Sequence, residues 1–231
     1  MSSHSREHRV RQRLSEAIEN YAKAIYELEE REGGPVTTTA LAERLGVTPA
    51  SASAMLKKLH RLKLVTRVPY KGVTLTTRGR KVALEVLRHH RLVELYLAES
   101  LGLPWDRVHD EAEVLEHVIS EELEELIAAK LGNPTRDPHG DPIPDRELQI
   151  AEGRTESLWA LDPGDKGTFV RVSDSDPDML RHLADRGIAP GDRFEVVEKH
   201  PFGGPLLARF GDSVHALGGE LAGAMRVEVR A

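Results

Sequence analysis

Apolar side chains recur at helical spacing in three segments near the start of the chain. These segments run from about Ser15 to Arg31, from Ala40 to Leu45, and onward from Thr48. Only Gly46 and Val47 separate the last two, Thr48 can cap the third helix, and Pro49 suits its first position. Two short helices joined by a brief connection containing glycine are typical of a helix-turn-helix.

A hairpin pattern follows this helical pair. Two β-prone runs, Leu64–Val68 and Val73–Thr76, flank the turn sequence Pro69–Gly72. A hairpin directly after a helix-turn-helix predicts a wing. We therefore expect residues 1–76 to form a winged helix-turn-helix domain.

Helical spacing returns at Thr77 and continues to about Leu101, then from about Pro104 to Ile119, and again to Leu131. The segment 132–144 is rich in proline and glycine and predicts irregular structure. We expect a helical domain over 77–144, a linker over 145–156, and a last domain over 157–231. In this last domain, five short β-prone runs and one helix, Asp178–Arg186, capped by Ser175 or Asp176, predict a small β-barrel. The fold class expected is α+β.

The amino-acid composition excludes several kinds of functional site. The chain has no cysteine, which excludes disulfides, thiolate metal sites and cysteine nucleophiles. The polar, basic segment Met1–Arg13 does not resemble a signal peptide, and the apolar stretch Leu92–Leu103 is too short and too charged to span a bilayer. We therefore expect a cytoplasmic protein without a membrane partner.

The charge is unevenly distributed along the chain. Residues 44–84 contain ten basic residues and no acidic one, which indicates a polyanion partner. The alternative is a winged helix used for protein contact. We expect the second helix to enter the major groove of double-stranded DNA, with basic residues on the helix and wing contacting phosphates. The expected contact residues are Thr48, Pro49, Ala50, Ser51, Ala54, Lys57, Lys58, Arg67 and Lys71.

Histidines and carboxylates are grouped in the helical domain. Glu113, Glu116 and His117 stand at i, i+3 and i+4, with His109 four residues before them, and His90 and Glu94 have the same spacing. Nitrogen and carboxylate oxygen without sulfur suit Mn²⁺, Fe²⁺, Co²⁺, Ni²⁺ or Zn²⁺. A solvated helix face and carboxylate acid–base catalysis are the alternatives, but no phosphate-binding, dinucleotide or nucleophile motif accompanies the cluster.

These segments carry a family resemblance. HDEAEVLEHVIS (His109–Ser120), preceded by RHHRLVELYL (Arg88–Leu97), resembles the diphtheria toxin repressor family of iron- and manganese-dependent regulators. YAKAIYELEE (Tyr21–Glu30), the helix-turn-helix and DPHGDPIP (Asp137–Pro144) match as well, and the last domain resembles the family's SH3-like, ferrous-transport-A-type module. The resemblance covers essentially the whole chain and implies a homodimer that binds a palindromic operator when loaded with metal.

The resemblance also implies two ligand sets. The primary set is Asn20, Glu113, Glu116 and His117, and the second set is His90, Glu94 and His109. Glu113 stands where iron-type members have cysteine, and a hard carboxylate favours Mn²⁺ over Fe²⁺, with Zn²⁺, Co²⁺, Ni²⁺ and Cd²⁺ able to bind in vitro. Manganese-type members have a carboxylate at the position of Lys23, so we expect two separated sites and not a close metal pair.

The last domain can add a ligand to the second set. Iron-type members supply a Glu and a Gln from this domain, and here only Asp174 or Asp176 can substitute; the alternative is that both simply cap the following helix.

The sequence thus predicts a metal-dependent transcriptional regulator, most simply a repressor controlling manganese or iron homeostasis, and not an enzyme. An iron-responsive member of the family and a winged-helix regulator that answers a small organic ligand are the alternatives. In the metal-free state, repulsion among Glu94, Glu113 and Glu116 is expected to loosen the protein until an ion binds.

Overall fold

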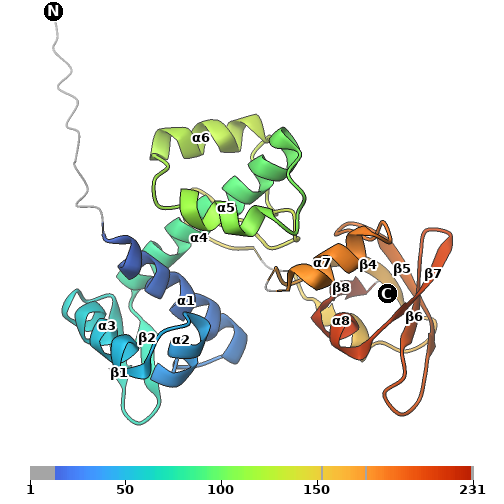
Figure 1. The fold of residues 1–231 in the computed structure, drawn as a ribbon, viewed down its shortest axis with the longest axis horizontal. Helices are drawn as coiled ribbons and strands as arrows, with labels where there is room; N and C mark the ends of the chain where they lie inside the picture. Colours follow the sequence, from blue (N-terminus) through green and yellow to red (C-terminus); the bar gives the residue numbers. More distant parts are fainter. Residues whose placement is uncertain (1–13, 152, 175, 230–231) are drawn as a thin grey trace, which may run out of the picture. The chain divides into compact units, whose positions relative to one another are not determined.

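We analysed a computed structural model that describes residues 14–151, 153–174 and 176–229. The chain divides into two units, the first ending at Val86 and the second beginning at Leu87. The division falls within one long helix, Thr77–Leu101. The mixture of helices with a two-stranded and a six-stranded sheet confirms the α+β class expected from the sequence (Figure 1).

The first unit is the predicted winged helix-turn-helix. Its elements are α1 (Glu16–Glu32), α2 (Thr38–Arg44), α3 (Pro49–Arg61), β1 (Val65–Val68), β2 (Gly72–Leu75) and the start of α4 (Thr77–Leu101). Thr37 and Thr48 cap α2 and α3, since their hydroxyls accept from the backbone N–H of Ala40 and Ser51. Buried Ile25, Leu41, Leu59 and Leu64 join the three helices to the hairpin in one core.

The second unit begins with the rest of α4, followed by α5 (Val108–Leu115) and α6 (Glu121–Lys130). The helix expected over Pro104–Ile119 was wrong at both ends. Residues 105–107 form a turn, and the helix stops at Leu115; just after it, the carbonyl of Glu116 contacts His89 Nδ1 at 3.0 Å. Ser120 then caps α6 through Leu123 N–H.

The irregular segment after α6 is fixed against the C-terminal sheet. The backbone N–H of Val172 donates to the carbonyl of His139 at 3.0 Å. Gly140 has φ +88°, and a Cβ there would lie 1.8 Å from the carbonyl oxygen of Val170, so only glycine fits. This close approach brings the segment 137–144 alongside the end of β4 (Lys166–Arg171).

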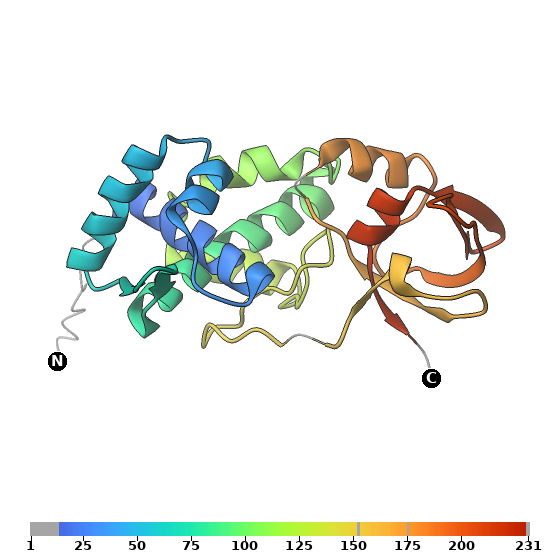
Figure 2. The same ribbon diagram turned by 90° about the horizontal axis from the view of Figure 1, so that it is seen from below.

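The C-terminal part is a small barrel built on the sheet order β3-β8-β4-β5-β6-β7 (Figure 2). The remaining elements are β3 (Glu156–Ser157), η1 (Leu158–Ala160), α7 (Pro177–Ala184), β5 (Arg193–Lys199), β6 (Leu206–Phe210), β7 (Ser213–Leu217), α8 (Gly219–Ala224) and β8 (Arg226–Val229). The single helix expected here is α7; α8 and η1 were missed, because a six-residue and a three-residue helix are too short to show a periodic pattern. Ser175, one of the two expected caps, lies outside the described residues, and Asp176 caps α7.

In the described parts of the chain, no helix is both long and apolar enough to cross a bilayer.

Candidate metal centre and DNA-binding face

All nine residues expected to contact DNA are exposed in the first unit. Thr48, Pro49 and Ala50 begin α3, and Arg67 and Lys71 belong to the hairpin. Arg67 also lines a surface hollow whose other walls come from α3: Ala50, Ser53, Ala54, Lys57, His60 and Arg61. The recognition helix and the wing therefore share one basic face, although DNA contact itself remains a prediction for each residue.

Two of the expected metal ligands lie one turn apart on α4. His90 and Glu94 are 4% and 0% exposed. His90 Nε2 lies 3.0 Å from Glu94 Oε1, and His90 Nδ1 donates to Glu116 Oε2 at 2.5 Å. The imidazole of His90 thus lies between two buried carboxylates, one from α4 and one from the end of α5.

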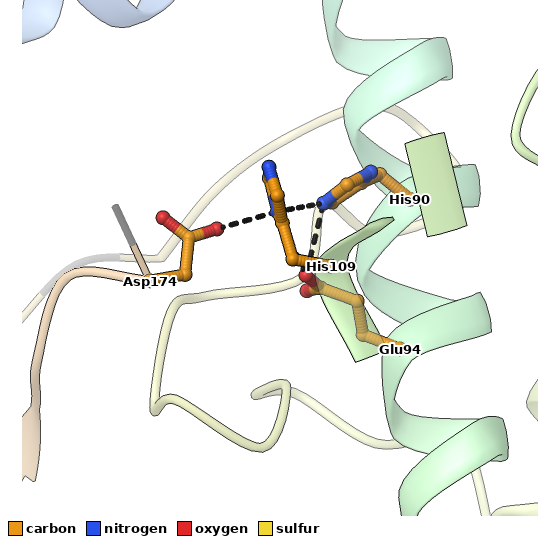
Figure 3. Close-up of side chains that lie close together, drawn as sticks. All are labelled: His90, Glu94, His109 and Asp174. Carbon is orange, nitrogen blue, oxygen red and sulfur yellow. Dashed lines mark hydrogen bonds and ion pairs between the residues drawn. The ribbon is translucent and has the colours of Figure 1, made fainter. Parts of the chain in front are cut away.

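His109, at the start of α5, lies between α4 and the C-terminal barrel (Figure 3). Its Nδ1 is 3.3 Å from Glu94 Oε1 and 3.1 Å from Asp174 Oδ2. The structure thus brings four potential ligands together, since one nitrogen or oxygen atom from each of His90, Glu94, His109 and Asp174 lies within 4.8 Å of the others. Asp174 joins the set, whereas Asp176 accepts from the N–H groups of Asp178 and Met179 as a helix cap.

The primary set expected from the resemblance is partly assembled within this unit. His117 Nε2 is 3.2 Å from Glu116 Oε1, and Glu113 forms a second potential ligand group with His90 and Glu116. Glu113 is also 3.8 Å from His109 Nε2. The two sets therefore adjoin, and His90 contributes to both.

Asn20, the remaining member of the primary set, lies on α1 in the first unit. Among the described residues, its buried Oδ1 has no hydrogen-bond partner. An unsatisfied amide oxygen is suited to an ion, but the assignment of Asn20 as a ligand stays a prediction. Lys23, on the same helix, is buried.

Sequence reasoning missed two buried residues of the DPHGDPIP turn. Asp137 and His139 form a third potential ligand group with Glu94. His139 Nε2 faces the carbonyl of Trp105 at 2.8 Å, so this nitrogen carries the proton of the neutral ring and Nδ1 presents a lone pair. A ring N–H held by a carbonyl is the usual support of a metal-bound histidine. The signal was available, because a histidine and an aspartate stand two residues apart in that motif.

The polar atoms of these groups fit a divalent ion. Within the part of the chain that the structure describes, neither Glu94 Oε2 nor His139 Nδ1 has a hydrogen-bond partner, although both are buried and lie 3.8 Å apart. Buried polar atoms without partners are unfavourable, and an ion coordinated by both would satisfy them. All donors in the three groups are nitrogen or carboxylate oxygen.

Part of the negative charge in this cluster is paired with imidazole. Burial would raise the pKa of Glu94, but the positive charge of His90 and contacts with both histidines lower it to about 2. The hydrogen bond to Asp174, followed by that to Glu94, raises the pKa of His109 to about 10. A protonated His109 therefore lies between two carboxylates, where a cation would lie. The expected repulsion among Glu94, Glu113 and Glu116 stays a prediction.

The comparison with known families covers nearly all of the chain. Residues 13–73 match the family described as iron dependent repressor, N-terminal DNA binding domain. Residues 76–145 match the iron dependent repressor, metal binding and dimerisation domain, and residues 157–229 match the FeoA domain.

Individual relatives agree with these matches. The chain is 34% identical to the iron-dependent repressor IdeR of Mycobacterium leprae, over 93% of this chain and 98% of that protein. It is 32% identical to the diphtheria toxin repressor of Corynebacterium glutamicum, over 93% and 97%. A solved manganese-dependent transcriptional repressor in complex with manganese is 42% identical, with a TM-score of 0.86, over 92% of this chain and all of that one. The chain therefore belongs to the iron-dependent repressor family of metal-dependent, DNA-binding transcriptional regulators, and not to a family of enzymes.

Proposed function

We propose that this protein is a manganese-responsive repressor that binds a palindromic operator as a homodimer when loaded with metal. The observation that carries the proposal is the cluster of buried His90 and Glu94 with half-buried His109 and Asp174, which adjoins Glu116 and contains only nitrogen and oxygen donors. Such a donor set matches the preference of Mn²⁺ for hard ligands.

The choice of manganese over iron rests on the absence of sulfur. The chain has no cysteine, so no thiolate is available to favour softer metals. The relative solved with manganese is 42% identical, whereas the mycobacterial iron-dependent repressor is 34% identical. Iron-dependent repression is the second candidate, because that relative also matches over nearly the whole chain, 93% of it.

Two adjoining sites are proposed in the helical domain. One uses Glu113, Glu116 and His117, with Asn20 added on the resemblance alone. The other uses His90, Glu94, His109 and Asp174. The turn residues Asp137 and His139 offer further ligand atoms for an ion beside Glu94. Bound Mn²⁺ would supply positive charge that holds these carboxylates together in place of a proton.

The metal acts by favouring one arrangement of the protein. An ion shifts an equilibrium only by the difference between its affinities for the two states. Asp174 belongs to the barrel side of the cluster and Glu94 to α4, so an ion held by both would fix the start of α7 against the metal-binding helices. The winged helix, which is expected to bind DNA, directly precedes α4 in the chain.

Dimerisation has a candidate surface in the same domain. Several large apolar side chains at the end of α4 and on or beside α5 and α6 are 45–69% exposed. A group of exposed apolar side chains is a common mark of an interface. The side chains are those of Leu101, Val114, Val118, Leu123 and Leu126. A two-fold dimer would present two recognition helices to the half-sites of a palindrome.

The test combines calorimetry with a DNA-binding assay. Mn²⁺, Fe²⁺ under anaerobic conditions and Zn²⁺ are titrated into the full-length, metal-free protein, and each loaded form is tested for gel retardation of duplexes selected from a random pool. We expect the tightest productive binding and the largest gain in DNA affinity with Mn²⁺. A larger gain with Fe²⁺ would replace manganese by iron in the proposal.

Matched variants separate the metal sites from the fold. Glu116→Gln removes a buried ligand charge, and Glu111→Gln makes the same change at an exposed position of α5. We expect Glu116→Gln to abolish metal-stimulated DNA binding while the circular dichroism spectrum is retained, and Glu111→Gln to behave as the wild type. Undiminished metal stimulation in Glu116→Gln would contradict the proposed site.

A further inference from the structure

The turn between β1 and β2 carries an aromatic ring that folding does not explain. The side chain of Tyr70 is fully exposed, at 109% relative accessibility, and its backbone has φ +61°. Left-handed backbone is unfavourable for a bulky residue, and glycine or asparagine would adopt it more easily. Tyr70 thus contributes no buried area while occupying a conformation unsuited to it, which points to a role outside the fold.

The hairpin below this ring is held firmly. Val36 and Val73 exchange both backbone hydrogen bonds, at 2.8 and 2.9 Å. A Cβ on Gly72 would lie 2.0 Å from the carbonyl oxygen of Val36, so the strand passes close against the segment before α2. The N–H of Lys71 donates to the carbonyl of Val68 at 3.1 Å and closes the turn. The ring is therefore presented at a fixed place at the end of the wing.

The wing is also tied to the recognition helix. His60, near the end of α3, contacts the carbonyl of Val65 on β1 at 3.1 Å through Nδ1. Arg67 of β1 lines the hollow formed by the exposed side of α3, and Lys71 follows Tyr70 directly. When α3 lies in a major groove, a hairpin attached beside it reaches the backbone and the adjacent minor groove, and its basic residues match the phosphates there.

A phenol suits this place chemically. The ring can pack against deoxyribose, and its hydroxyl can donate to the N3 or O2 acceptors that every A·T pair presents in the minor groove. A G·C pair adds the N2 amino group of guanine, which projects into the groove and obstructs a flat ring. Such a contact distinguishes A·T from G·C without adding charge.

We propose that Tyr70 is a DNA-contact residue that enters the minor groove beside each half-site and favours A·T pairs there. This rests on the DNA binding of the family and not on the identity of the metal or of its ligands. The wing then contributes to the choice of sequence, in addition to the phosphate contacts of Arg67 and Lys71.

The experiment uses the full-length protein with Mn²⁺ and a labelled duplex that the wild type has selected from a random pool. Three probes are compared, with A·T, G·C or inosine–cytosine pairs in the flank that the wing reaches. Inosine lacks the N2 amino group and leaves the major-groove edge of the pair unchanged. For the wild type we expect affinity to be about tenfold lower with G·C, on the scale of one aromatic contact to nucleic acid, and restored by inosine.

Tyr70→Gly and Tyr70→Asn relax the backbone and remove the ring. We expect both to bind the A·T probe about tenfold more weakly, to bind all three probes equally, and to melt at no lower temperature than the wild type. The slope of log K against log salt should stay unchanged, because no charge is lost, whereas Lys71→Ala should lower it by about one. Phe202→Gly removes the matching exposed aromatic, φ +59°, from a barrel hairpin and should leave DNA binding unaltered.

Two results would overturn the assignment. If Tyr70→Gly and Tyr70→Asn keep the affinity and flank preference of the wild type, the ring does not contact DNA. If they lose affinity but their melting temperature falls, as for a residue needed by the fold, Tyr70 is structural. A wild type that binds these probes without Mn²⁺ would leave the Tyr70 result intact and would contradict only the proposed metal dependence.

Discussion

Metal binding at the His109 cluster should release a proton, and the contacts of His109 indicate which group loses it. His109 Nδ1 lies between Glu94 and Asp174, at 3.3 and 3.1 Å, and the hydrogen bond to Asp174 is the larger cause of a pKa near 10. Only neutral imidazole binds an ion, so Mn²⁺ must displace this proton. Glu94, with its pKa lowered to about 2, is already ionised at pH 7 and releases none.

The pKa of His109 sets how strongly the apparent metal affinity depends on pH. With a value of about 10, roughly one molecule in a thousand carries neutral His109 at pH 7. The apparent metal affinity at pH 7 should therefore be about a thousandfold below its limit above pH 10, and should rise about tenfold per pH unit between 7 and 9. Without metal, the contacts of protonated His109 that raise its pKa also stabilise the fold. This contribution is fully present below pH 6.5 and disappears as the pH rises through 10.

The assay is isothermal titration calorimetry of Mn²⁺ in two buffers of different ionisation enthalpy at pH 7. We expect about one proton released per ion at this site, and about one fewer in His109→Asn. Asp174→Asn removes the main cause of the raised pKa, so its proton release should disappear at a lower pH than in the wild type. Release near zero at pH 7, or an affinity independent of pH, would refute the reasoning.

Three further predictions concern DNA binding and stability. Arg67→Ala should lower the salt slope of DNA binding by about one and leave the ranking of duplexes unchanged in gel shifts; a changed ranking would mean direct base contact. Gly140→Ala should lower the free energy of unfolding by roughly 2 kcal/mol or more, because its Cβ would meet the carbonyl of Val170, whereas Gly132→Ala, which meets nothing within 4 Å, should cost about 1 kcal/mol; equal costs in denaturant titrations would contradict this. Ser120→Ala should cost about 1 kcal/mol by loss of the α6 cap, measured in the same way.

Local patterns predicted the N-terminal unit closely. The threonines at the start of α2 and α3 act as caps because a cap needs only a hydroxyl and the N–H groups of the next turn. The wing was predicted because Gly72 and its neighbours form a turn between two β-prone runs. Interactions within a few residues of each other are visible in a sequence, and these elements depend on them.

Long-range contacts account for what was missed. The carbonyl of Glu116, just after the end of α5, contacts His89, which lies 27 residues earlier. The turn residues Asp137 and His139 gain their significance only from Glu94, more than forty residues earlier. A spacing rule within one helix cannot predict which other segment will face it, because loop closure brings distant residues together without a local signal.

The candidate metal centre separates what the sequence determines from what the tertiary structure determines. The sequence by itself determined the residue types, since a chain without cysteine can offer an ion only nitrogen and oxygen, and it determined that His90 and Glu94 share a helix face. Only the tertiary structure decided between Asp174 and Asp176. Asp176 caps α7 through local N–H groups, whereas Asp174 reaches His109, because the packing of the barrel against the 137–144 segment carries that carboxylate to the cluster. The two aspartates are the same residue type, two positions apart, and the sequence cannot tell them apart; contact with an imidazole or with the N–H groups of a helix distinguishes them.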